Sequence, residues 1–170
     1  VNVLMPNRRA DDLLRIIDKA GPDVIIAAET DLLRQARLDV VERDYPHTMK
    51  CPLDNLYGMH VYSRLALEDG QTQFLVEPGV PSMHAMLVLR SGRRVRLHCV
   101  HPKPPSPTET PSSAPRDAEL IAVAKSVAES EQGTPVIVAG DLNDVAWSAT
   151  TRLFRKISGL LDPRVGRGMY

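Results

Sequence analysis

Residues 135–148, PVIVAGDLNDVAWS, place polar side chains directly after an apolar run. The run ends at Gly140, and Asp141, Asn143 and Asp144 follow at once. Carboxylate and amide oxygens suit a hard cation such as Mg²⁺, and a nearby Asp can orient or deprotonate an attacking water. An Asn can donate to a phosphate oxygen, so this stretch indicates metal-assisted phosphoester hydrolysis. The alternative is a plain turn or helix cap, because Asp and Asn favour both.

Other apolar runs also carry or end in polar groups. Asn2 lies in the first run, Glu29 ends the run 23–29, and His101 follows a further run. Ligands of α/β proteins bind beyond the carboxyl ends of the strands, so we expect Asn2, Glu29, Asp141 and Asn143 to meet in one cleft. The order and placement of the set carry this prediction. Taken alone, Glu29 is typical of a solvated strand end and His101 of a structural histidine.

The elements that must position these residues alternate between strands and helices. Apolar residues at helical spacing predict helices over 11–21, 31–41 and 116–130. Strands are predicted at 1–5, 23–29, 57–64 and from 135, with a hairpin over 84–102 that turns at Ser91-Gly92. Residues 102–115 are rich in Pro, Ser and Thr and predict an irregular loop. This order favours a layered α/β or α+β domain.

Composition narrows the classes of function. The 170 residues suit a single domain, and the formal net charge of zero argues against a strongly basic face for duplex DNA. Two cysteines, Cys51 and Cys99, make neither a disulfide framework nor a zinc site. No apolar run is long enough to span a membrane. We therefore expect a soluble domain, whose cellular location stays open.

Six stretches resemble the endonuclease/exonuclease/phosphatase superfamily, the DNase I-like proteins: VNVLMPN, PDVIIAAET, YGMHVYSR, HCVHPKPP, RDAEL and PVIVAGDLNDVAWS. They follow the family's order and cover most of the chain. AGDLND resembles the family's Gly-Asp-Phe-Asn motif with Leu142 in place of Phe, and Ala28-Glu29 stands where Gln-Glu is common. The resemblance implies an α/β (α+β) four-layer sandwich, with two β-sheets packed face to face and helices outside.

The resemblance also implies roles by position. Asn2 and Glu29 would hold a divalent metal, which would be Mg²⁺, with Mn²⁺ as its substitute. Asp141 would orient or activate the attacking water, and Asn143 would hydrogen-bond the scissile phosphate. His101 matches a phosphate-contacting histidine of DNase I-like and sphingomyelinase-like members, which favours these over exonuclease III-like repair enzymes.

Substrate contacts are assigned to Asn7, which ends the first run, and to Trp147, the single tryptophan. Trp147 is interpreted as part of the core or of a pocket wall rather than as a stacking platform. The family implies a phosphoester substrate: nucleic acid, a phospholipid headgroup or an inositol phosphate.

The resemblance further implies an incomplete domain. Family members close with an Asp-His pair near the C-terminus, whereas no histidine follows Asp141 here, and the chain begins without Met. We expect residues 1–170 to be one domain that lacks the last strands and was cut from a larger, perhaps membrane-anchored protein. An exposed strand edge would then invite self-association, and activity would be low. The alternative function is a non-catalytic binding module.

Overall fold

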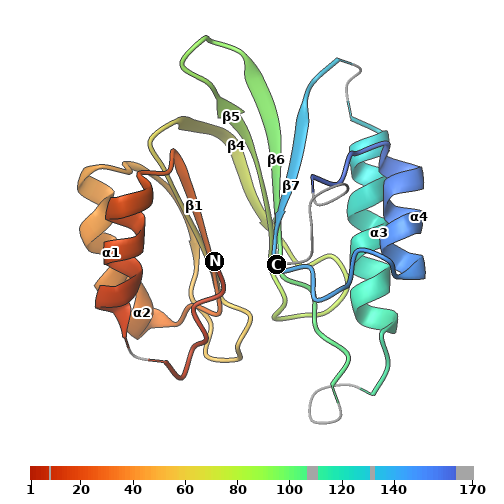
Figure 1. The fold of residues 1–170 in the computed structure, drawn as a ribbon, viewed down its shortest axis with the longest axis horizontal. Coiled ribbons are helices and arrows are strands. Elements are labelled where there is room, and N and C mark those ends of the chain that lie inside the picture. Colours follow the sequence, from red (N-terminus) through yellow and green to blue (C-terminus); the bar gives the residue numbers. More distant parts are fainter. Residues whose placement is uncertain (8, 107–110, 131–132, 164–170) are drawn as a thin grey trace.

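The computed structural model describes residues 1–7, 9–106, 111–130 and 133–163. Figure 1 shows four layers: two helical layers enclose two β-sheets that face each other. Helices α1 (Ala10–Ala20) and α2 (Leu32–Leu38) cover one sheet, and α3 (Ala114–Ala128) and α4 (Ala149–Ser158) cover the other. The predicted four-layer α/β sandwich is confirmed.

The first sheet has the strand order β1-β3-β2. Its strands are β1 (Val24–Ala28), β2 (His47–Cys51) and β3 (Met59–Ser63), and both pairs are antiparallel. Helix α1 ends where the sequence predicts, because Gly21 adopts a left-handed φ of 54° and its N–H bonds the Ile17 carbonyl. A 3₁₀ helix, η1 (Asp39–Arg43), continues α2.

The second sheet has the order β4-β5-β6-β7. Its strands are β4 (Ala66–Gln73), β5 (Ser82–Val88), β6 (Arg94–Val100) and β7 (Val136–Gly140). Strands β5 and β6 form the predicted hairpin, with Gly92 at a positive φ of 80° in its turn. Strand β7 pairs parallel to β6, and α3 makes the crossover between them.

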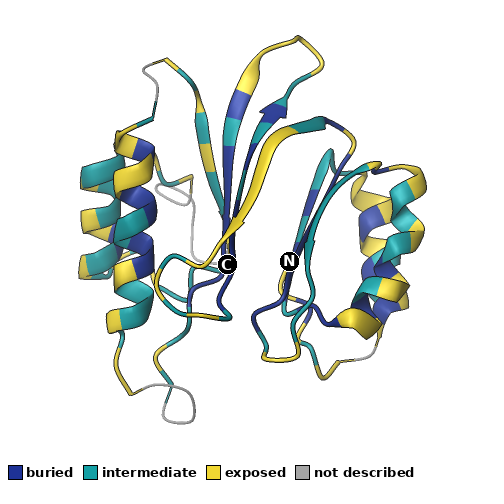
Figure 2. Ribbon diagram, turned by 180° about the vertical axis from the view of Figure 1, so that it is seen from behind, coloured by how far each residue is buried: buried dark blue, intermediate teal, exposed yellow. Residues whose placement is uncertain are grey.

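Apolar side chains fill the space between the two sheets. Alternate residues of a strand point to opposite faces, so each central strand sends one set inward. The inward set is Met59, Val61, Met83, Leu97 and Cys99, and each of these is buried. Figure 2 shows the buried segments gathered along the inner strands. This shared layer holds the sheets face to face.

The opposite faces of the sheets bind the helices. On the first sheet, Ile25, Ala27 and Tyr62 pack against Leu13 and Ile17 of α1. Burial of each such aliphatic side chain stabilises the fold by roughly 1.5–3 kcal/mol. On the second sheet, a cluster built around Val100, Val123 and Val127 joins the strands to α3. None of the described helices is long and apolar enough to span a membrane.

Three elements escaped the sequence analysis, namely β2, β4 and α4. Strand β4 is mostly exposed and polar, and β2 is half-buried without alternation, so neither shows a clear period of two. Helix α4 begins at a Ser148 cap whose hydroxyl accepts the Thr151 N–H at 2.8 Å. That signal lay within the stretch interpreted as a polar loop.

Two predicted boundaries are wrong. Residues 1–5 form no strand but a single parallel bridge from Asn2 to Ala28, because Leu4 turns the chain with a φ of 50°. The loop predicted at 102–115 ends early, since α3 already begins at Ala114 and proline is tolerated in a first helical turn. Residues 107–110 of that loop lie outside the described residues.

A substitution of Gly140 tests how closely the end of β7 approaches β6. A Cβ added there would lie 1.9 Å from the Val100 carbonyl oxygen, whereas one added at Gly92 meets nothing within 4 Å. Both glycines have positive φ, so Gly92→Ala measures the backbone cost alone, about 1–2 kcal/mol. We expect Gly140→Ala to lower the free energy of unfolding by a further 1–3 kcal/mol, roughly, from overpacking. Urea unfolding of both variants measures the difference, and equal losses would contradict the close approach.

Candidate active site

A cleft of about 320 Å³ opens where the ends of β1 and β7 meet. It is lined by Val1, Asn2, Ile26, Ala28, Gly140, Asp141, Leu142, Asn143 and Asp144. The two strands belong to different sheets, so the cleft lies at the junction of the two layers. Asn2, Asp141 and Asn143 therefore line one cleft as expected, whereas Glu29 is not among the lining residues and reaches the site through its contact with Asn2.

The Asn2 side chain links the two carboxylates of this region. Its Nδ2 donates to Glu29 Oε1 at 2.6 Å and to Asp141 Oδ2 at 3.1 Å. Since one nitrogen contacts both acids, the two carboxylates are close neighbours. Three chain segments that are far apart in sequence thus converge as predicted. The chemical roles of the three residues stay predictions.

The backbone around this bridge is held in an unusual conformation. Leu4, Glu29 and Asn143 have positive φ values of 50°, 63° and 48°, which cost most residues other than glycine energy. Side-chain hydrogen bonds support them: the Leu4 N–H donates to Asn2 Oδ1 at 2.9 Å, and the Met5 N–H donates to Glu29 Oε2 at 3.1 Å. Such outliers concentrate at functional sites, which supports a functional reading of the cleft.

Asn143 is anchored on two sides. Its backbone N–H donates to Asp141 Oδ1 at 3.2 Å, and its side-chain Nδ2 donates to the Pro102 carbonyl at 2.9 Å. The second bond joins the chain after β7 to the chain after β6. A side-chain amide has two hydrogens, so one bond to Pro102 leaves the other for a ligand.

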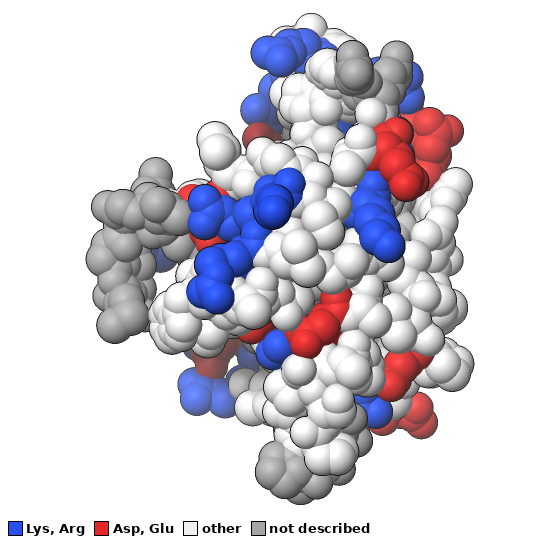
Figure 3. Space-filling model, turned by 90° about the vertical axis from the view of Figure 1, so that its right-hand side faces the viewer, with Lys and Arg blue, Asp and Glu red and all other residues white. Residues whose placement is uncertain are grey.

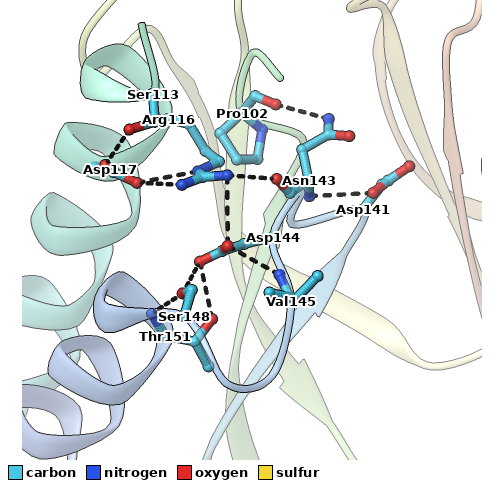
Figure 4. A network of polar contacts seen from close by, with 10 residues as sticks. All are labelled: Pro102, Ser113, Arg116, Asp117, Asp141, Asn143, Asp144, Val145, Ser148 and Thr151. Carbon is cyan, nitrogen blue, oxygen red and sulfur yellow. Dashed lines mark hydrogen bonds and ion pairs between the residues drawn. The ribbon is translucent and has the colours of Figure 1, made fainter. Parts of the chain in front are cut away.

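Arg116, at the start of α3, fastens the loop that follows β7 (Figure 4). Its Nη1 donates to the Asn143 carbonyl at 3.0 Å and lies 3.4 Å from Asp144 Oδ1. Its Nε and Nη2 both donate to Asp117 Oδ1. Burial raises the pKa of Asp117, but hydrogen bonds from Arg116 and Ser113 outweigh it and hold that pKa below its usual value. The carboxylate therefore stays charged beside the guanidinium.

Asp144 holds the other end of the same loop. Its side chain is 3% exposed, and its Oδ2 accepts the Ser148 and Thr151 hydroxyls at 2.5 and 3.0 Å. These bonds tie the loop to the first turn of α4. For Asp144 the turn-or-cap alternative is therefore the better interpretation. The anchoring role of Arg116 was not predicted, although RDAEL places a charged pair at a helix start.

The other candidate residues lie less centrally. His101 is 3% exposed, and its ring centroid lies 5.5 Å from that of Tyr57. Asn7 is exposed, and its Oδ1 accepts the Arg9 N–H at 3.1 Å beside the start of α1. Trp147 is 65% exposed, so its interpretation as part of the core is wrong, and a pocket-wall position stays a prediction. None of these three lines the cleft described above, and their roles stay predictions.

The donor set suits a hard cation. Mg²⁺ is usually bound through one or two carboxylates and keeps several waters, and Glu29 supplies one carboxylate beside the Asn2 amide. That amide also carries an oxygen, which accepts the Leu4 N–H in this arrangement. Among the described residues, no group of three or more His, Cys, Asp or Glu side chains is arranged to hold a metal. A carboxylate and an amide oxygen are ligands of the kind that Mg²⁺ takes, so the chemistry of Glu29 and Asn2 fits this ion.

The chain belongs to the endonuclease/exonuclease/phosphatase family, whose model matches residues 1–169. The four-layer fold and the placement of the strand-end residues agree with this assignment. The comparison with curated protein sequences found no match.

Solved structures with the same fold include a TDP2, a beta toxin and a sphingomyelinase C. A humanized D. rerio TDP2 is 19% identical with a TM-score of 0.76, over 90% of this chain and 63% of that chain. A β-hairpin deletion mutant of the beta toxin of Staphylococcus aureus is 17% identical with a TM-score of 0.77, over 95% of this chain and 72% of that chain. Sphingomyelinase C of Streptomyces griseocarneus is 16% identical with a TM-score of 0.72, over 95% and 68%. The chain thus spans less than two thirds of the TDP2 chain.

Replacement of Arg116 by Met tests the loop anchor. The change leaves the buried Asp144 carboxylate without its cation, so we expect the free energy of unfolding to fall by about 3 kcal/mol. Arg94→Met is the matched control, because Arg94 is half exposed and pairs with Glu68 on the surface. It should cost less than about 1 kcal/mol. Denaturant unfolding followed by circular dichroism measures both, and similar losses would show that Arg116 is not an anchor.

Proposed function

We propose that the cleft is the active site of a metal-dependent phosphoester hydrolase that uses Mg²⁺, or Mn²⁺ in its place. The observation that carries the proposal is the convergence of Asn2, Glu29 and Asp141 through one amide. Membership of the family supports the general chemistry. The metal and the particular reaction are part of the proposal.

Each residue has a distinct task in this proposal. Glu29 and Asn2 hold the cation, which when bound would polarise the phosphate and neutralise developing charge. Asp141 accepts a proton from the attacking water, because its carboxylate faces the same cleft. Asn143 directs its second amide hydrogen to a phosphate oxygen while the bond to Pro102 keeps the amide in place. His101 is retained as a candidate phosphate contact, although it would need access that its burial now limits.

The substrate is a phosphoester from nucleic acid, a phospholipid headgroup or an inositol phosphate. The solved relatives span two of these chemistries: one D. rerio TDP2 structure is a complex with a single-strand DNA product, and another relative is a sphingomyelinase C. The net charge of zero gives little electrostatic support for a long duplex.

A non-catalytic binding module is the second candidate. The observation that favours it is the burial of His101, which is 3% exposed and so has little access to a phosphate group in the cleft. Under this reading the cleft would bind a metal or phosphate group without turnover. Metal binding and turnover must therefore be measured separately.

We further propose that β7 offers its outer edge to a second copy of the chain. Strand β7 stands last in its sheet, and Ile137 on it is 46% exposed. Beside it, an apolar groove of about 630 Å³ runs between the strand and α4, with Val138, Leu142 and Phe154 in its lining. An edge strand with adjacent apolar surface is prone to pairing with another chain.

The catalytic roles predict two different defects. Glu29→Gln should weaken Mn²⁺ binding, measured by electron paramagnetic resonance, by at least about tenfold because it removes a charged ligand. Asp141→Asn should retain the fold and lower turnover of a chromogenic phosphodiester about 10²–10⁴-fold. Asp18→Asn, at an exposed carboxylate of α1 that does not line the cleft, is the control. Unchanged metal affinity in Glu29→Gln would refute the site, and metal binding without any turnover would favour the binding module.

Self-association through β7 predicts a concentration-dependent shift in size-exclusion chromatography. Ile137→Lys places a charge on the exposed edge and should restore the monomer. Ile16→Lys, at a residue of α1 that is 61% exposed, is the matched control and should leave the shift unchanged. A chain that elutes as a monomer at all concentrations would disprove the contact.

A further inference from the structure

Helix α4 and the loop before it expose an unusual mixture of apolar and basic side chains. Trp147 is 65% exposed, Leu153 46% and Val145 44%, and Arg152 and Lys156 are exposed between or beside them. We propose that this surface, the α4 ridge (Val145, Trp147, Arg152, Leu153 and Lys156), docks the protein on an anionic lipid membrane. The docking does not require the cleft to be catalytic.

The ridge is one continuous surface. Ala149, Arg152, Leu153 and Lys156 follow the helical spacing of three and four residues, and all four are exposed. The other side of α4 is turned inward, where Phe154 packs in the apolar cluster shared with α3. Arg152 Nη1 donates to the Trp147 carbonyl, which holds the loop next to the helix. The Trp147 backbone therefore lies beside the outward face of α4.

The positive charge of the ridge is uncompensated. Helix α4 contains no Asp or Glu, and within the described part of the chain neither Arg152 nor Lys156 forms an ion pair. By contrast, the exposed arginines near α1 pair with acids: Arg9 and Arg15 with Asp12. Figure 3, which views the α3–α4 side, shows Lys and Arg in several groups, with Asp and Glu patches on the same face. The charge is thus available to an anionic partner.

The combination of side chains favours a lipid surface over nucleic acid. Tryptophan prefers the boundary between headgroups and acyl chains, and Leu153 and Val145 gain by leaving water there. Each Lys or Arg near an anionic membrane raises affinity about fivefold. Nucleic acid would bind the cations and stack on the indole, but it would bury little of the exposed Leu and Val side chains. Apolar and basic groups together therefore fit anionic lipid best.

Trp147 is the only tryptophan, so its fluorescence reports directly on docking. The intact chain is mixed with phosphatidylcholine vesicles, with or without phosphatidylserine, in EDTA so that no metal-dependent turnover occurs. We expect a blue shift with phosphatidylserine and quenching by brominated lipid. Unchanged emission with both vesicles would overturn the proposal. A response to a single-stranded oligonucleotide but not to vesicles would also overturn it and identify a nucleic-acid surface.

Paired variants locate the contact. Arg152→Glu with Lys156→Glu should weaken vesicle binding at least about 25-fold, because two favourable charges are lost and reversed. Lys19→Glu with Arg43→Glu changes the same charge at exposed positions on the opposite helical layer and should bind like the unaltered chain. Leu153→Asp should also weaken binding, whereas Leu33→Asp on α2 should not. Equal effects in ridge and control variants would overturn the assignment of the ridge, and circular dichroism verifies that each variant is folded.

Discussion

The apolar layer between the two sheets is the constraint on which the site depends. Met59, Val61 and Met83 are fully buried there, and sheets packed in this way lie about 10 Å apart. At that spacing the ends of β1 and β7 come near each other at one border of the sandwich. A single short side chain, Asn2, can then bridge Glu29 and Asp141. The site is thus a product of sheet packing rather than of one local motif.

The loop after β7 shows a second level of organisation. Asp141, Asn143 and Asp144 all line the cleft, but the Asp144 carboxylate is bound by hydroxyls of α4 and lies beside Arg116. Neighbouring residues of one short segment therefore divide between the proposed chemistry and a structural role. The backbone accepts a positive φ at Asn143 because hydrogen bonds to Pro102 and from Arg116 hold both sides of that residue. Buried polar networks of this kind specify one arrangement when every member has a partner.

One loop connects the cleft to the α4 ridge. The loop that begins at Asp141 in the cleft continues through Trp147 to the exposed face of α4. A membrane bound at the ridge would therefore contact the same loop that carries the proposed catalytic Asp141.

Sequence analysis was most successful where local patterns match their final environment. The amphipathic spacing of α1, with its Gly21 stop, and the buried run of β1 report their surroundings directly. Strand β4 was not predicted, because its residues are mainly polar and show no clear pattern. It is a strand only because β5 pairs with it. Helix α4 was not predicted for a related reason. In the sequence its Ser148 cap cannot be told from a polar loop residue, and the helix is evident only where it packs on α3.

By itself the sequence determined the family, the layered architecture and the types of residue at the strand ends, because these follow from periodicity and motif order. Only the tertiary structure decided which of those residues meet. Asn2, Glu29 and Asp141 come together, while Asp144 withdraws into a structural role and Trp147 turns outward. The physical reason is that each outcome depends on contacts between distant segments. Those contacts are set by the packing of the sheets, by the Arg116 anchor and by the packing of α4 on α3. No local sequence pattern encodes them.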